Sequence, residues 1–264
     1  MNVGLHSDAD LERRFGGLRR LYGDVGYTKL RAATVAVVGL GGVGSWTVEA
    51  LARSGVAQLV LIDLDHVSES NINRQVQATG PTLGQHKGEA LRERIAAIHP
   101  GCVVHVVDAF VDTDNWPALL PVPVQALVDA CDQVRAKATL AAWALRERVP
   151  LVCVGAAGGK RAAQQVDVQD LADATHDPLL ANLRQRLRKQ AGAPRQGRMG
   201  VRCVFSRESV AAPATGGDAA GSDANHAHDG SLNCHGYGSS VAVTATFGMV
   251  AAGDVISQLL AAAP

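Results

Sequence analysis

Three glycines and a group of polar residues have the types and spacing needed to bind and cleave a nucleotide. Gly39, Gly41 and Gly44 form the pattern G-x-G-x-x-G between a β-branched run and a helical pattern, which is the context in which this motif binds phosphate. The first glycine permits a tight turn, the second lets backbone approach phosphate, and the third packs helix against strand. The helix N-terminus then offers free N–H groups to an anion. This motif fits NAD and ATP equally well.

The polar residues that follow favour ATP. Asp63 ends the next predicted strand, where a carboxylate binds the ribose hydroxyls of either nucleotide. Arg74 and Lys87 decide between the two, because displacing pyrophosphate from ATP develops charge that fixed cations stabilise. Asn71 and Asn73 can donate neutral hydrogen bonds to the same oxygens. A single Arg or Lys is usually a solvated surface charge, but this cluster lies between a phosphate-binding turn and a helix start.

A further carboxylate, Asp132, follows a buried strand that ends near Asp129. Its place suits a Mg²⁺ ion, held through water. The alternative is an N-cap for the helix predicted over 136–148. Asp65, in contrast, is better described as a loop carboxylate or helix cap.

The elements that must position these residues alternate between strand and helix. We predict helices over 8–31, 45–54, 87–98 and 136–148, and strands over 34–38, 58–63, 103–107, 125–130 and 151–154. This alternation indicates an α/β fold with a doubly wound, mostly parallel, Rossmann-like sheet. Because ligands bind beyond the strand C-termini of such sheets, the glycine turn, Asp63 and the 129–132 turn are expected to converge on one crevice.

Composition limits the class of protein. Lys+Arg and Asp+Glu are equal at 25 each, so any nucleic-acid or membrane partner must be met by a local patch. Five cysteines without zinc or redox spacing suit reduced thiols in a cytoplasmic protein. The N-terminus lacks the pattern of a signal peptide. Residues 239–260 are nearly long enough to span a membrane, but Asp254 would be costly there, so we expect a buried helix, at a subunit contact rather than in a membrane.

Together these motifs resemble the ThiF/MoeB/E1-like superfamily of adenylating enzymes. The resemblance runs from about residue 14 to 159 and rests on Gly39-Leu40-Gly41-Gly42-Val43-Gly44, Asp63-Leu64-Asp65, Ser70-Asn71-Ile72-Asn73-Arg74-Gln75, Gly84-Gln85-His86-Lys87 and Asp129-Ala130-Cys131-Asp132. It implies that ATP and Mg²⁺ are used to convert a carboxylate into an acyl-adenylate, commonly by a dimer. It also implies roles: Gly42 contacts ATP, Asp63 the ribose, Asn71, Arg74 and Lys87 the phosphates, and Asp132 the metal.

Other motifs resemble the tRNA threonylcarbamoyladenosine dehydratase group within this superfamily. They are Arg14-Phe15-Gly16-Gly17, Leu21-Tyr22-Gly23, Asp177-Pro178-Leu179, Leu183-Arg184, Cys203-Val204-Phe205-Ser206 and Val243-Thr244-Ala245-Thr246-Phe247-Gly248. The group adenylates the carboxylate of the threonylcarbamoyl group on adenosine 37 of tRNA. The activated carboxyl then closes into a ring, with loss of water overall.

The chain departs from the sulfur-carrier branch of the superfamily. That branch donates a second arginine to ATP across the dimer, and the position is Gly17 here, with Arg20 as a candidate substitute. The zinc-binding CxxC pairs are absent, and so is a cysteine between positions 154 and 202. Cys234 is a candidate for a sulfur-linked role with a sulfur-transfer protein, although an unreactive loop thiol fits equally.

A basic segment supports an RNA substrate independently. Residues 184–207 hold eight cations and no acidic residue: Arg184, Arg186, Arg188, Lys189, Arg195, Arg198, Arg202 and Arg207. Such a cluster on a neutral protein can bind phosphates, although charge runs are more often a solvated face.

Four hypotheses therefore remain. The leading one is an ATP-dependent tRNA-modifying dehydratase, and the others are a sulfur-carrier adenylating enzyme, a nicotinamide-dependent oxidoreductase and a non-catalytic RNA-binding protein. We expect an adenylation core with N-terminal helices over 1–159. An extension over 160–264 would carry the basic segment, a mobile loop at about 211–230 and a C-terminal helix, integrated into one domain.

Overall fold

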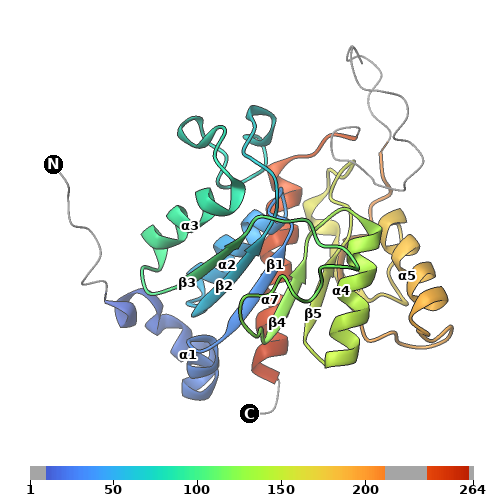
Figure 1. The fold of residues 1–264 in the computed structure, drawn as a ribbon, viewed down its shortest axis with the longest axis horizontal. Coiled ribbons are helices and arrows are strands. Elements are labelled where there is room, and N and C mark those ends of the chain that lie inside the picture. Colours follow the sequence, from blue (N-terminus) through green and yellow to red (C-terminus); the bar gives the residue numbers. More distant parts are fainter. Residues whose placement is uncertain (1–9, 212–236, 262–264) are drawn as a thin grey trace.

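A seven-stranded sheet forms the centre of the protein (Figure 1). The computed structural model describes residues 10–211 and 237–261. The strand order is β3-β2-β1-β4-β5-β7-β6, and every neighbouring pair is parallel except β6 with β7. The strands are β1 Thr34–Val38, β2 Gln58–Ile62, β3 Val103–Val107, β4 Ala126–Asp129, β5 Leu151–Val154, β6 Val166–Asp170 and β7 Arg202–Ser206. The predicted α/β, mostly parallel sheet is confirmed.

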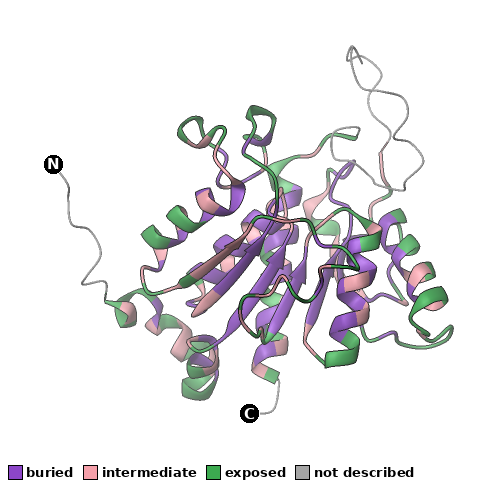
Figure 2. Cartoon of the chain, viewed as in Figure 1, coloured by how far each residue is buried: buried purple, intermediate pink, exposed green. Residues whose placement is uncertain are grey.

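Helices cover both faces of the sheet, so the central strands are buried on both sides (Figure 2). One apolar layer joins the sheet to α1 Leu11–Leu30, α2 Gly44–Arg53, α3 Lys87–Ile98 and α7 Val241–Ala261. The opposite layer joins it to α4 Val134–Glu147 and α5 Pro178–Gln190. Short 3-10 helices lie at Glu69–Asn71, Gly80–Thr82 and Ala163–Gln165.

Several predicted boundaries match those of the structure, namely 34–38, 87–98, 103–107 and 151–154. The first helix begins later than predicted, because the Asp10 side chain accepts a hydrogen bond from the Arg13 N–H and caps it. It is also kinked at Gly23, which has a φ of 71°. Strands β6 and β7 were not predicted from sequence. They extend the sheet with residues of the 160–264 portion.

The long apolar segment forms α7, which packs along α2 and the sheet. Within the described residues, α7 is the one helix whose length and hydropathy would allow a membrane span, and 50% of the relevant window is buried in the protein. Gly248 permits close contact with α2, since a Cβ there would lie 2.6 Å from the Val43 carbonyl oxygen and 2.7 Å from the Trp46 Cβ. This contact holds α7 against the first turn of α2.

A methyl group at Gly248 should therefore force α7 away from α2. We expect Gly248→Ala to lower the free energy of unfolding by about 1–3 kcal/mol, the usual cost of overpacking. Gly253→Ala is the matched control in the same helix, because a Cβ at Gly253 meets no atom within 4 Å. It should be neutral or add up to about 1 kcal/mol through helix propensity. Chemical denaturation of both variants checks this, and equal stability of the two would contradict the packing argument.

A histidine links the end of α1 to the end of α3. His99 is fully buried, its ring lies edge-on to Phe15 at 4.7 Å, and its Nε2 accepts a hydrogen bond of 2.7 Å from Arg31. Arg14 donates to the carbonyls of Ala97 and Ile98 nearby. Burial and then these two guanidinium groups lower the pKa of His99 to about 4.

The neutral form of His99 therefore stabilises the fold, and this contribution should depend on pH. It is complete above the unfolded pKa of about 6.5 and is lost as pH falls toward 4, because the unfolded state takes up the proton first. The loss should be on the order of 3 kcal/mol. His99→Gln, which keeps an acceptor for Arg31, should unfold with a flatter pH dependence between 6.5 and 4. Denaturant titrations across this range measure it, and parallel curves for the two proteins would disprove the assignment.

Candidate functional site

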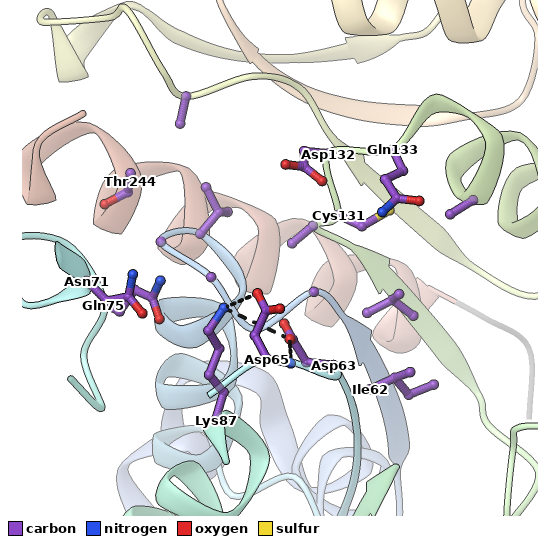
Figure 3. A pocket seen from close by; sticks show the side chains of 18 of the residues that line it. Ile62, Asp63, Asp65, Asn71, Gln75, Lys87, Cys131, Asp132, Gln133 and Thr244 are labelled. Atoms are coloured by element: carbon purple, nitrogen blue, oxygen red, sulfur yellow. Dashed lines mark hydrogen bonds and ion pairs between the residues drawn. The ribbon is translucent and has the colours of Figure 1, made fainter. Parts of the chain in front are cut away.

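A pocket of about 410 Å³ lies at the C-terminal ends of β1, β2, β4 and β5 (Figure 3). It is lined by the glycine turn, the loop after β2, the 68–75 segment, the start of α3, the turn after β4, the loop after β5 and α7. The predicted convergence of these turns on one crevice is confirmed.

The glycine turn has the geometry that its sequence predicts. Gly39 has a φ of 83°, and a Cβ there would lie 2.8 Å from the Cys131 backbone nitrogen. A Cβ at Gly44 would collide with the Gly39 carbonyl oxygen at 1.8 Å, so only glycine lets α2 begin here. Gly39, Gly41 and Gly42 line the pocket, whereas Gly44 lies behind it as a packing residue. The N-terminus of α2 thus lies beside the pocket and favours an anion.

Asp63 stands just past the end of β2 and is 7% exposed. One of its oxygens accepts a 2.5 Å hydrogen bond from the Leu40 N–H, and the other accepts from the Asp65 N–H at 2.8 Å. Lys87, at the first position of α3, is buried, and its Nζ is 2.6 Å from Asp65 and 4.0 Å from Asp63. The pocket thus holds the buried Lys87 ammonium group beside the Asp63 carboxylate, and both residues line the pocket.

The 68–75 segment supplies the other cation. Arg74 lines the pocket, and its guanidinium donates to the Ser70 carbonyl at 2.6 Å. Its own carbonyl accepts from the Trp46 indole at 2.9 Å and from Thr244 at 3.4 Å. Two helices, α2 and α7, therefore fix the backbone of Arg74. Sequence reasoning gave neither Trp46 nor Thr244 a role, although Thr244 lies within the 243–248 motif.

The two asparagines have different positions. Asn71 is buried and lines the pocket, and its side-chain oxygen accepts from the Ser68 N–H, so its amide nitrogen remains for a ligand. Asn73 does not line the pocket. It donates to the Ser239 carbonyl at 3.0 Å and accepts from Arg74. Its placement with the phosphate-binding residues is therefore corrected: it tethers the start of α7.

Asp132 is exposed. With Cys131 and Gln133 it lines the side of the pocket opposite Asn71 and Gln75 (Figure 3). The N-cap position of α4 is Gln133, so the alternative that Asp132 caps this helix is wrong. Mg²⁺ in nucleotide sites is usually held by one or two carboxylates together with substrate phosphates. A single free carboxylate in the pocket fits that pattern. The described residues contain no cluster of three or more ligands for a metal held by protein alone.

The loop after β5 forms a wall that the sequence did not reveal. Gly155, Ala156 and Ala157 line the pocket, and the buried Asp177 accepts from the Ala156 N–H at 2.8 Å while capping α5. Burial raises the pKa of Asp177. Farther along, the Gly159 N–H donates to the Gly238 carbonyl, and the Gly159 carbonyl accepts from the Ala211 N–H, each at 2.9 Å. Gly159 thus joins two chain segments to the wall of the site.

The cations of the basic segment differ in exposure: some are bonded within the protein, and others, including Arg198 at 3.9 Å from the Asp170 carboxylate, are exposed. Arg184 donates to carbonyls that follow β6, Arg188 to carbonyls after α5, and Arg202 pairs with Asp254 of α7. The solvent-exposed cations of the predicted tRNA contact are Lys189, Arg195 and Arg198. Tests of RNA binding should begin with these three.

The cysteines that the structure describes are free thiols. Cys131 lines the pocket, but burial raises its pKa well above the usual value, so it stays protonated. Cys234 and nearly all of the loop expected at 211–230 lie outside the described residues.

Comparison with known proteins places the chain in a family. The pattern described as the ThiF family matches residues 14–263. The chain belongs to the ThiF family. It is 42% identical to the tRNA threonylcarbamoyladenosine dehydratase of Escherichia coli, over 95% of each chain. A crystal structure of the E. coli enzyme, TcdA, in complex with ATP has 40% identity, covers 96% of both chains and gives a TM-score of 0.84.

A second kind of relative matches about half of this ThiF-family protein. The molybdopterin-synthase adenylyltransferase of Salmonella typhimurium is 39% identical over 127 residues, which is 48% of this chain and 51% of its own. The resemblance to the superfamily and to the dehydratase group is thus confirmed. The dehydratase match covers 95% of this chain, about twice the share that the second relative matches.

The bond from Trp46 to Arg74 gives a test of the site geometry. Trp46→Phe removes the indole donor, and we expect ATP to bind about fivefold to tenfold more weakly, as loss of a hydrogen bond of about 1 kcal/mol implies. Trp143→Phe is the matched control, because Trp143 packs on Trp116 on the other face of the sheet. It should lose stability but bind ATP normally. Calorimetric titration separates the two, and equal affinities for both variants would refute the role of Trp46.

Proposed function

We propose that this protein catalyses the ATP-dependent dehydration of N6-threonylcarbamoyladenosine at position 37 of tRNA. The observation that carries the proposal is the single pocket in which Arg74 and Lys87 meet the glycine turn. The full-length match to a protein named tRNA threonylcarbamoyladenosine dehydratase supplies the substrate. ATP is the second substrate, since the related TcdA structure was solved with ATP.

In the first step, the threonyl carboxylate attacks the α-phosphorus of ATP and pyrophosphate leaves, which gives an acyl-adenylate. Asp63 would accept hydrogen bonds from the ribose hydroxyls. The phosphates would be bound by the backbone N–H groups of the glycine turn and by Asn71, Arg74 and Lys87. Lys87 must then exchange Asp65 for a phosphate oxygen, since these two are paired at 2.6 Å. The cations stabilise the charge that develops on the leaving group.

In the second step, an atom of the same threonylcarbamoyl group attacks the activated carbonyl and releases AMP. The carboxylate oxygen leaves with AMP and the attacking group gives up its proton, so the nucleoside has one water less than the free acid. Mg²⁺, which we place at Asp132, would neutralise phosphate charge. The apolar wall at Gly155, Ala156 and Ala157 limits access of water to the acyl-adenylate.

The surroundings of the site support further parts of the proposal. Lys189, Arg195 and Arg198 are exposed cations and are the contacts that we propose for tRNA phosphates. We also propose that the protein is cytoplasmic and that it forms a homodimer. The homodimer is supported by Leu21 and Val25 of α1, which are apolar but 68% and 73% exposed and which a second subunit would cover. They lie beside Arg20, the candidate to replace the arginine missing at Gly17. A sulfur-transfer partner acting at Cys234 remains a hypothesis from sequence.

The decisive experiment supplies the protein with ATP, Mg²⁺ and tRNA bearing threonylcarbamoyladenosine, and weighs the digested nucleosides. The expected product is lighter by one water, and AMP and pyrophosphate form in equal amounts. Arg74→Ala and Asp132→Ala should each slow the reaction by about 100-fold or more, the usual effect of removing a fixed group that stabilises developing charge.

Arg146→Ala is the control, because Arg146 is 65% exposed on α4 and does not line the pocket. It should keep full activity. ATP–pyrophosphate exchange that needs a ubiquitin-like carrier protein, with no change in the nucleoside, would replace this proposal with the sulfur-carrier alternative.

A further inference from the structure

A fully buried ion pair lies beside the pocket. Lys137 of α4 and Asp129, the last residue of β4, are both 0% exposed, and Nζ stands 3.1 Å from the carboxylate. Neither residue lines the pocket. Burial alone would lower the pKa of Lys137, but the Asp129 carboxylate and nearby thiols offset this and raise it. Lys137 is thus a permanent cation within the protein interior.

A buried ion pair is weak evidence for stability. A buried ion pair pays a desolvation cost that often exceeds its attraction, and apolar side chains of similar size can replace such pairs without loss of stability. Its geometry offers another explanation, because each partner makes directed bonds to backbone at the end of a strand.

The bonds of the pair fix two walls of the pocket. Lys137 donates to the Val154 carbonyl at 2.6 Å, where β5 ends and the wall at 155–157 begins. The other oxygen of Asp129 accepts from the Cys131 N–H at 3.2 Å and the Cys131 thiol at 2.9 Å, which turns the chain after β4. That turn carries Asp132 into the pocket and packs against Gly39.

We propose that Lys137 is a positioning residue which, through Asp129 and Val154, holds the 130–133 turn so that Asp132 faces the metal-bound triphosphate. This inference rests on the proposed function and on the place given there to Mg²⁺. Lys137 touches neither substrate nor metal. It acts as the shared anchor of the two strand ends, so that the carboxylate of Asp132 needs no rearrangement when the nucleotide enters.

The test measures ATP affinity by calorimetry with Mg²⁺ and with a chelator. In the wild-type protein, we expect ATP to bind more tightly with Mg²⁺ than with the chelator, and we call this ratio of affinities the gain from Mg²⁺. In Lys137→Met the gain should fall at least tenfold, a usual effect of losing a residue that orients a metal ligand. Affinity in the chelator should stay within about twofold, because Lys137 makes no bond to the glycine turn or to Lys87.

Two further variants separate positioning from stability. Arg94→Met is the matched control, because it removes a cation that pairs with the buried Glu49. This pair lies at the contact of α2 with α3, away from the pocket. The variant should be less stable but should keep the gain from Mg²⁺. If Lys137→Met fails to fold because Asp129 is left as an unpaired buried charge, the double variant D129N/K137M tests the positioning role instead. It removes both charges of the pair. It too should lose the gain from Mg²⁺.

The outcomes can be told apart. A normal gain from Mg²⁺ in D129N/K137M, or equal weakening with Mg²⁺ and with chelator, would overturn the positioning role. If wild-type protein instead fails to dehydrate the modified tRNA, the proposed function fails, whatever the Lys137 variants do.

Discussion

The carboxylate of Asp63 joins the loops that leave β1 and β2, and the rest of the site is built on this junction. It accepts the Leu40 N–H from the glycine turn and the Asp65 N–H from its own loop. With these groups fixed, Gly39 can approach the turn after β4 within van der Waals contact, and Lys87 can lie beside two carboxylates. Parallel neighbouring strands make this possible, because their C-terminal ends lie at one edge of the sheet.

Much of the fold and part of the site follow from local sequence. The β-branched run at 34–38 and the glycines after it specify a strand, a turn and a helix whatever the rest of the chain does, and Asp63, Arg74 and Lys87 lie near the turn in sequence. The same reasoning failed for Asn73, because its side chain bonds to Ser239, which is 166 residues away. A spacing pattern places a backbone segment in the pocket but does not determine which way each side chain points.

The residues that sequence reasoning missed support the site from a distance. Trp46 and Thr244 hold the Arg74 carbonyl, Asp177 holds the wall after β5, and Lys137 joins two strand ends. Each looks ordinary in its own segment: an aromatic on a helix, a threonine among alanines, a helix cap, a lysine on an amphipathic helix. Their roles exist only through tertiary contacts. Strands β6 and β7 did leave a signal, the alternation at 166–169 and the apolar run at 203–205, but both runs are short.

The two bonds of Gly159 have a consequence for how this chain can vary. They hold residues 211 and 238 against the same glycine, whose φ of 70° and close contact with Val210 exclude a side chain. The connection between those two residues therefore starts and ends at one fixed point beside the pocket. Because the entropy of closing a loop rises only with the logarithm of its length, insertions and deletions there would leave the catalytic scaffold almost unchanged. The length of this connection can thus change without rebuilding the nucleotide site.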